Sequence, residues 1–290
     1  MLTKEQLQLK FSQGLRFLDG ATGSNLRVLG MPKGANTELW VLEHPQVLME
    51  LQKKYADAGS QIIYAPTFQA QPIALDKFGL APKTEEINKK LVSISKEAAP
   101  NCLIAGDLTT LAAYIESGNI ENFDSLVENY RRQIRGLLDG GADLLVAETL
   151  MYPQEAEAIF TAAELEQAGA VMYSFTVTSD GSLFSGPEVG PVLQELEQVG
   201  AAAVGFNCVC GDMMTPYLVS KLRRYVKGPL ICKPNAGNPV INSLGIAEYS
   251  MTPEEFSHMM RKCATNGATL FGGCCGTTPE HIAQMIKALI

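Results

Sequence analysis

The chain has 290 residues, of which 46% are hydrophobic and 19% charged, and its formal net charge is −8. This composition is typical of a water-soluble globular protein, and an acidic balance without a basic stripe argues against nucleic-acid binding. The sequence contains no apolar run that predicts a membrane span and no signal-peptide core near Met1. We therefore expect a cytoplasmic protein without a membrane or nucleic-acid partner.

The first predicted element is a short N-terminal helix, which Thr3 and Gln6 open as a capping box. After it, short apolar runs alternate with longer segments whose apolar residues recur at spacings of three and four, as in helices packed on a sheet. The eight predicted strands cover residues 16–21, 62–68, 102–108, 143–150, 171–177, 202–209, 230–236 and 269–276. This alternation predicts a single α/β domain over residues 1–290, folded as a (β/α)8 TIM barrel.

Four of these strands follow one internal repeat, in which a glycine precedes an apolar strand that ends in polar or sulfur side chains. The glycines suit the left-handed position where a helix ends, and they are Gly59, Gly141, Gly200 and Gly267. Eight residues after each glycine stand Thr67, Thr149, Cys208 and Cys275. The repeat therefore places polar groups at the C-terminal strand ends, where barrels build their active sites.

The strongest local motif is FGGCCGTTPEH at residues 271–281. Its glycines allow a tight bend, so that the sulfurs of Cys274 and Cys275 can face one point although neighbouring strand residues face opposite ways. Cys208, in GFNCVCG, stands at the matching level of the sixth predicted strand. Alternate barrel strands contribute to one layer, so the three cysteines predict a three-thiolate zinc site with an open fourth position.

The alternative for any cysteine is that it packs as a small buried apolar residue. We expect that role for Cys102, Cys232 and Cys263, and we expect Cys210 to be a loop thiol. An odd total of seven cysteines in a reducing compartment favours free thiols and metal ligands over disulfides.

Thiolate ligands make zinc a good host for another sulfur atom. A free thiol, with a pKa of about 8.5, is mostly protonated at neutral pH, and zinc binding displaces that proton. Zinc that activates water more often has histidine or carboxylate ligands, and none of His44, His258 and His281 ends a predicted strand. The pattern therefore favours activation of a thiol over hydrolysis.

Carboxylates and amides end several other predicted strands. Asp19 follows the first strand, where turn formation explains it equally well, and Asp107 ends the third. Glu148 follows a buried run and needs a cationic partner, for which a substrate ammonium is a candidate. Asn207 and Asn235 offer amides for a carboxylate. Together these groups predict a zwitterionic thiol substrate such as homocysteine.

These motifs resemble the homocysteine S-methyltransferase family, and most closely the homocysteine-binding barrel of cobalamin-dependent methionine synthase. The matching segments are LDGATG (18–23), PTF (66–68), AETL (147–150), GFNC (205–208), PNAG (234–237) and GGCCGTTPEH (272–281). The resemblance implies a homocysteine S-methyltransferase that forms methionine, with zinc on Cys208, Cys274 and Cys275. It also implies substrate contacts from Asp19, Thr67, Glu148, Asn207, Asn235 and Ala236.

The methyl donor is left open. None of the three histidines lies in an Asp-x-His-x-x-Gly corrinoid-binding motif, so methylcobalamin would have to come from a separate corrinoid protein, and betaine or S-methylmethionine are small alternatives. The chain departs from the family pattern at Pro66, at Thr109–Thr110 and at Lys233, where the cobalamin branch typically has an acid.

Three other functions remain open at this stage. The barrel could serve a corrinoid-dependent methyl-transfer system with a different substrate. Lys233, near a strand end, could form an imine in a Schiff-base lyase, or could instead pair with a strand-end acid. A zinc-bearing barrel could also act as a non-catalytic binding subunit.

Overall fold

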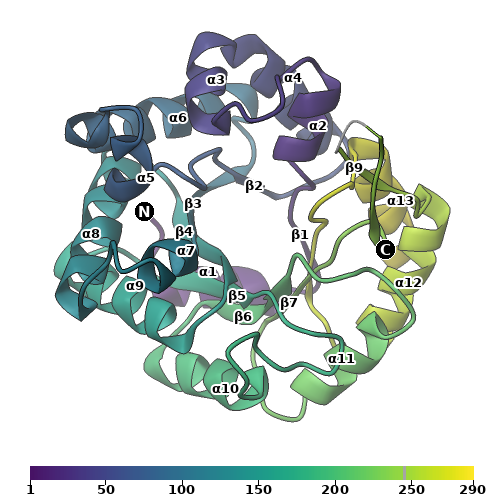
Figure 1. Ribbon diagram of the computed structural model, residues 1–290. Helices are drawn as coiled ribbons and strands as arrows, with labels where there is room; N and C mark the ends of the chain where they lie inside the picture. Colours follow the sequence, from purple (N-terminus) through teal and green to yellow (C-terminus); the bar gives the residue numbers. More distant parts are fainter. Residues whose placement is uncertain (244–245) are drawn as a thin grey trace.

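The computed structural model describes residues 1–243 and 246–290. Eight parallel strands lie in the order β1-β10-β7-β6-β5-β4-β3-β2, and a parallel bridge between Leu18 and Ile62 joins the two ends of this sheet. The sheet is thereby closed into a barrel, and helices surround it (Figure 1). The predicted (β/α)8 TIM barrel is confirmed.

The barrel strands are β1 (Arg16–Phe17), β2 (Ile62–Tyr64), β3 (Leu103–Thr109), β4 (Leu144–Leu150), β5 (Val171–Phe175), β6 (Ala203–Asn207), β7 (Leu230–Lys233) and β10 (Leu270–Phe271). The helices before β3 are α1 (Lys4–Ser12), α2 (Gly23–Val28), α3 (Thr37–Glu43), α4 (Pro45–Asp57), α5 (Pro72–Asp76), the 3-10 turn η1 (Ala81–Lys83) and α6 (Thr84–Ala98). The later helices are α7 (Ala112–Glu116), α8 (Phe123–Asp139), α9 (Pro153–Leu165), α10 (Val189–Val199), α11 (Thr215–Leu222), α12 (Pro253–Thr265) and α13 (Pro279–Leu289).

Each of the eight predicted strands overlaps one strand of the barrel. Most observed strands end earlier than predicted, and β1 and β10 are the shortest, at two residues each. The chain leaves the sheet after Phe17 and Phe271 because the next residues form loops across the barrel mouth. Two of these loop contacts join strand ends: the Gly273 N–H donates to Asp19 O at 3.0 Å, and the Cys274 N–H to Pro234 O at 2.7 Å.

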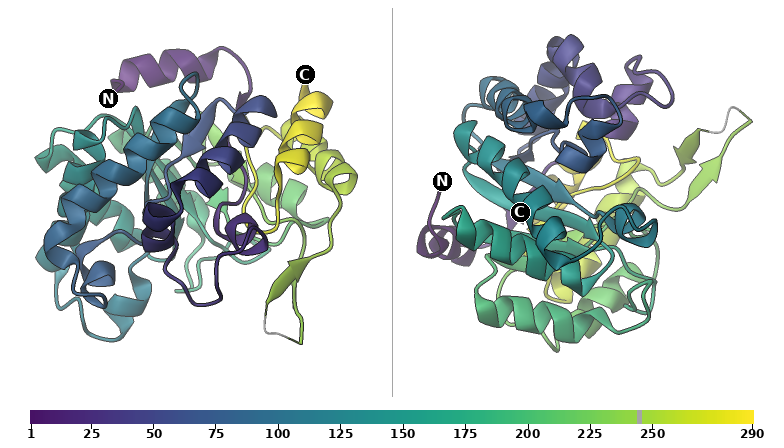
Figure 2. Two further views of the ribbon diagram at one scale, coloured as in Figure 1. Left: turned by 90° about the horizontal axis from the view of Figure 1, so that it is seen from above. Right: turned by 60° about the vertical axis from the view of Figure 1, so that its left-hand side comes forward.

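An antiparallel hairpin of β8 (Pro239–Ile241) and β9 (Ala247–Tyr249) follows β7 and extends away from the barrel (Figure 2). It is not among the predicted strands. All three β8 residues are exposed, so the segment lacks the buried face that produces an alternating hydrophobic pattern.

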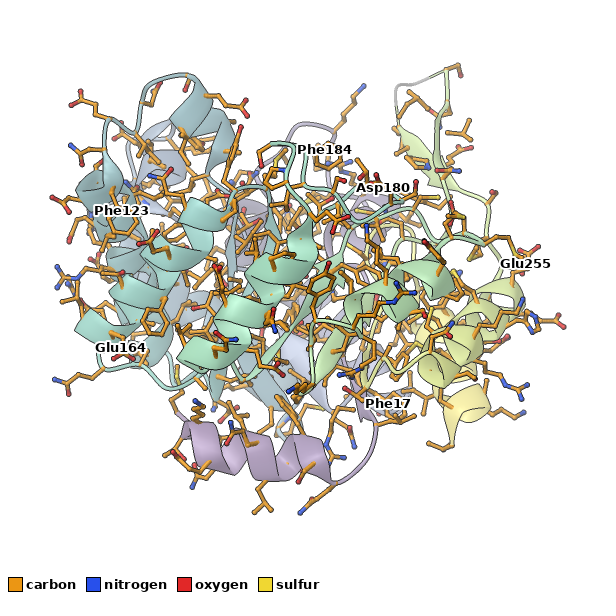
Figure 3. The ribbon with its side chains drawn as sticks, turned by 90° about the horizontal axis from the view of Figure 1, so that it is seen from below. Phe17, Phe123, Glu164, Asp180, Phe184 and Glu255 are labelled. Carbon is orange, nitrogen blue, oxygen red and sulfur yellow. The ribbon has the colours of Figure 1, made fainter. Side chains whose placement is uncertain are left out.

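Helix α1 covers the end of the barrel opposite the hairpin (Figure 3). Its Leu7 and Phe11 are buried and pack with interior residues of the barrel such as Leu144. The predicted capping box is confirmed, since Thr3 Oγ1 accepts from the Gln6 N–H at 3.3 Å and Gln6 Oε1 accepts from the Thr3 N–H at 2.9 Å. With this end closed, the functional cavity opens at the other.

The repeat glycines have the left-handed backbone that the sequence predicts. Their φ angles are 105° at Gly59, 79° at Gly141, 111° at Gly200 and 104° at Gly267. A residue with a Cβ is strained in this region, so glycine ends the helix and lets the chain turn into the next strand.

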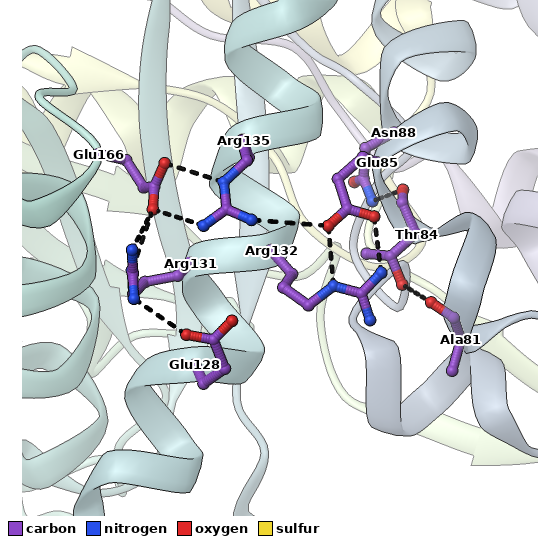
Figure 4. Close-up of polar contacts among 9 residues, drawn as sticks. All are labelled: Ala81, Thr84, Glu85, Asn88, Glu128, Arg131, Arg132, Arg135 and Glu166. Carbon is purple, nitrogen blue, oxygen red and sulfur yellow. Dashed lines mark hydrogen bonds and ion pairs between the residues drawn. The ribbon is translucent and has the colours of Figure 1, made fainter.

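Ion pairs join three outer helices on the side of α8 (Figure 4). Arg132 Nη2 lies 2.6 Å from Glu85 Oε2 on α6, and Arg135 Nη2 lies 2.9 Å from Glu166 Oε1 at the end of α9. These side chains are partly exposed, so each pair contributes at most about 1 kcal/mol. The network aligns neighbouring helices and lies outside the barrel mouth.

We predict that Gly205→Ala on β6 destabilises the barrel by about 3 kcal/mol, because a Cβ at this position would lie 2.2 Å from Ile231 O on β7. Urea unfolding measures the effect. Gly23→Ala is the matched control, since a Cβ there meets no atom within 4 Å. Equal stability of the two variants would contradict the close strand packing.

In the described ranges, none of the helices combines the length and apolarity that a membrane crossing requires.

Candidate metal and substrate site

A cavity of about 880 Å³ opens at the C-terminal ends of the barrel strands. Its walls also include the α2 region and the β8–β9 hairpin. The strand-end residues that line it are Asp19, Tyr64, Asp107, Glu148, Thr149, Cys208, Lys233, Cys274 and Cys275. The cavity therefore combines the predicted cysteines with several buried charged groups.

The three predicted cysteines meet at one point in this cavity. The sulfurs of Cys208, Cys274 and Cys275 all lie within 4.8 Å of one another. Cys208 follows β6 with a left-handed backbone, at φ 55°, while the other two follow β10. Residues that follow β7 connect these loops, since the Ala236 N–H donates to Cys275 O at 2.9 Å. Seven cysteines lie in the described ranges, and all are free thiols.

Glycines make this approach possible, as the motif predicts. A Cβ on Gly273 would lie 2.3 Å from Thr277 Oγ1, and one on Gly272 would lie 2.8 Å from Asp19 O. Gly276 has φ +80°, and a Cβ there would lie 2.3 Å from the Tyr249 ring. The loop can take this shape only with glycine at these positions.

The three sulfurs form a group that could hold a metal ion. Interactions with Cys208 and then Cys274 lower the pKa of Cys275 to about 3. Interactions with Cys274 and then Cys275 raise the pKa of Cys208 well above its usual range. Tetrahedral zinc at about 2.3 Å from each sulfur requires sulfurs about 3.8 Å apart. The donor set fits this ion, and separations within 4.8 Å are compatible with that spacing.

Charged side chains lie beside the sulfurs at the centre of the barrel. Lys233 Nζ lies 3.2 Å from Glu148 Oε2 and 4.7 Å from the centroid of the Tyr64 ring, and both charged side chains are buried. Asp19 Oδ2 accepts from the Tyr64 N–H at 2.8 Å. Burial lowers the pKa of Lys233, but Glu148 and the other nearby acids outweigh burial and raise it well above its usual range. Burial raises the pKa of Asp19 to about 7.

The other predicted substrate residues are not among the described residues that line the cavity. Thr67 Oγ1 donates to Asp107 O at 2.8 Å and accepts from the Asp107 N–H at 3.0 Å. Asn207 Oδ1 accepts from the Thr149 N–H at 2.7 Å, and its Nδ2 donates to Thr149 Oγ1 at 2.7 Å. These side chains hold the strand ends that form the cavity wall.

Asn235 and Ala236 take part in the site through their backbone. The Asn235 N–H donates to Val209 O at 2.9 Å, next to Cys208, and the Ala236 N–H donates to the loop of Cys275. Substrate contacts from Thr67, Asn207, Asn235 and Ala236 stay predictions.

Sequence reasoning missed Tyr249. This side chain lies on β9, lines the cavity and interacts with the Cys275 sulfur, which lowers the Cys275 pKa further. Burial and then Cys275 raise the pKa of Tyr249. No sequence signal links the two residues, because the hairpin carries no motif and its strands are only three residues long.

Comparison with known proteins agrees with this geometry. The family model for homocysteine S-methyltransferase matches residues 16–289. Methionine synthase of Mycobacterium tuberculosis is 28% identical over 96% of this chain, and that of Mycobacterium leprae is 28% identical over 93%. These matches cover 25% and 24% of the two relatives, so the chain spans about a quarter of their length.

Solved structures of homocysteine methyltransferase MmuM from Escherichia coli have the same fold. The oxidized form matches with a TM-score of 0.82 and 25% identity, over 97% of this chain and 98% of that one. The metallated form matches with a TM-score of 0.80 and 26% identity, over 96% and 97%. With the family match over nearly the whole chain, these findings show that this protein belongs to the homocysteine S-methyltransferase family.

Proposed function

We propose that this chain is a zinc-dependent S-methyltransferase that converts homocysteine to methionine within a single domain over residues 1–290. The observation that carries the proposal is the convergence of three sulfurs at the wall of a cavity large enough for an amino acid and a donor group. Family membership supports the substrate, and the metallated form of the Escherichia coli relative supports a metal.

In this proposal, Cys208, Cys274 and Cys275 hold the zinc ion, and three protein ligands are the usual number in catalytic zinc sites. When bound, zinc favours the ionised form of a substrate thiol at neutral pH. The thiol loses its proton, its sulfur forms a bond to the methyl carbon, and the bond between that carbon and the donor breaks. The protein aligns the two reactants, because the cavity holds both at the same strand ends.

We propose that Asp19 and Glu148 serve the amino-acid part of the substrate, since both line the cavity beside the cysteines. Thr67 and Asn207 would act by fixing the neighbouring strand ends. Asn235 and Ala236 would act through their backbone, in the loop after β7 that contacts both cysteine segments. The carboxyl group of Asp19 suits the ammonium of homocysteine, and Glu148 would act beside it through its ion pair with Lys233.

For the methyl donor, we propose methylcobalamin carried by a corrinoid-binding unit outside residues 1–290, as the resemblance to the homocysteine-binding barrel of cobalamin-dependent methionine synthase implies. Betaine and S-methylmethionine are the alternatives to test in parallel. A Schiff-base mechanism is disfavoured, because an imine-forming lysine needs a lowered pKa, whereas Glu148 raises that of Lys233.

We predict that removing zinc weakens homocysteine binding at least about tenfold, because the metal–sulfur contact is lost. Calorimetric titration of zinc-loaded and chelator-stripped protein measures the change. Homoserine, with a hydroxyl in place of the thiol, is the control and should bind both forms equally. Homocysteine affinity that is indifferent to zinc would contradict the proposed role of the metal.

A further inference from the structure

Three buried carboxyl groups from three different barrel strands line the cavity, and Glu38 on α3 is a fourth. Asp19 follows β1, Asp107 lies on β3 and Glu148 lies on β4. All three are buried, with exposed fractions of 1%, 4% and 7%. Among the described residues that line the cavity, Lys233 is the buried cation and forms an ion pair with Glu148, whereas Arg27 is exposed.

The remaining two carboxyl groups have oxygens without a partner. Asp19 Oδ1 and Asp107 Oδ1 are buried, and neither has a hydrogen-bond partner among the described residues. A buried polar atom without a partner costs about 1–3 kcal/mol, and more when it is charged. An apolar residue would fill either position at lower cost, so the two carboxyl groups indicate a ligand with hydrogen-bond donors.

The surroundings hold both groups in place. Asp107 is two residues after Ala105, which packs in the barrel interior, so its side chain points to the same face of β3. Its backbone is fixed by Thr67 and by Gln133 Nε2, which donates to Asp107 O at 3.2 Å. Asp19 is held through Oδ2 by the Tyr64 N–H. Asp19 is thus fixed through one carboxylate oxygen, and Asp107 is fixed through its backbone.

The charges identify the ligand chemistry. Three carboxyl groups face a single lysine ammonium, so the floor of the cavity has a deficit of positive charge. Burial, and next the Glu148 carboxylate, raise the pKa of Asp107 well above its usual range, so the ionised form of Asp107 needs a cation beside it. A substrate cation with several N–H donors removes the deficit and pairs the free oxygens at once.

We propose that Asp107, a residue without an assigned role in the family resemblance, binds the substrate ammonium together with Asp19, while Lys233 neutralises Glu148. This inference rests on the proposed function and adds the group that selects an α-amino thiol. Asp107 is thus a specificity-determining residue.

The test compares homocysteine with its des-amino analogue mercaptobutyrate, by calorimetric titration of the zinc-loaded protein. Asp107→Asn is expected to weaken homocysteine binding about ten- to hundredfold and to leave mercaptobutyrate binding within about twofold. Glu157→Gln is the matched control, since it removes one negative charge from the exposed face of α9, outside the cavity lining. This control should bind both thiols as the wild type does.

A second measurement separates recognition from folding. Asp107→Asn replaces a buried carboxyl group whose Oδ1 lacks a partner by a neutral amide of the same shape, so the ligand-free variant should unfold at the wild-type temperature or above. A lower unfolding temperature, or equal weakening of both thiols, would show that Asp107 is structural and would overturn the proposal. Unchanged homocysteine affinity would overturn it as well.

Other results of the same titrations would contradict the proposed function itself. If the zinc-loaded wild type binds neither thiol, both the function and the inference are wrong. If it binds both thiols equally well, thiol binding stands and the ammonium site is wrong.

Discussion

Replacing Cys208 by serine is expected to remove zinc and to abolish methyl transfer. The three sulfurs lie within 4.8 Å of one another, and a hydroxyl in place of one of them is a much harder, weaker ligand for zinc. Loss of a direct ligand should lower zinc affinity more than about a hundredfold. This effect is larger than that of losing a residue that only hydrogen-bonds a metal ligand. Metal content after dialysis and the methylation rate measure the two losses.

Cys210→Ser is the control, because this thiol lies two residues further along the same loop and is not part of the sulfur trio. It should retain zinc and activity. Serine tolerates the left-handed backbone of residue 208 about as well as cysteine, so the comparison reports on the sulfur. If Cys208→Ser keeps full metal content, the ligand assignment is wrong.

The second large effect is on stability. Lys233→Met should lower the free energy of unfolding by about 3–5 kcal/mol, because it leaves the Glu148 carboxylate buried without its cation. Glu148 is 7% exposed, and Lys233 Nζ is its partner at 3.2 Å. Denaturant unfolding of the metal-loaded protein measures the difference.

This destabilisation should grow with pH. Burial raises the pKa of Glu148 in the folded protein, and Lys233 opposes that shift. Without the lysine, the folded pKa rises further above the unfolded value of about 4.3. The folded variant then binds more protons than the unfolded chain, so its stability falls as the pH rises from the unfolded pKa towards the folded one. The free energies of unfolding of the variant and the wild type, measured at pH 5 and pH 8, show whether the destabilisation grows with pH.

A double variant is the control for the pair. Adding Glu148→Gln to Lys233→Met removes the unpaired charge, so most of the lost stability should return. If the double variant is less stable than Lys233→Met alone, the loss comes from packing around the lysine stem and not from the charge.

Local patterns were sufficient to predict the architecture. Apolar periodicity and the glycines at residues 59, 141, 200 and 267 determine which segments become strands and where each helix ends, since both depend on neighbours in the sequence. The same repeat placed Cys208 and Cys275 at equivalent strand ends. The glycines around Cys274 also indicated the bend that brings the paired cysteines together.

The partners of the polar side chains in the cavity were decided by the closed barrel. Lys233 and Glu148 are 85 residues apart in the chain and meet because their strands face each other across one interior. The β8–β9 hairpin brings Tyr249 to Cys275, although no sequence motif in the hairpin predicts this contact. The closed barrel also leaves Asp107 with a buried oxygen that has no hydrogen-bond partner among the described residues. Sequence patterns specify which residues reach the C-terminal face, whereas distances and charge compensation there depend on contacts between strands far apart in the chain.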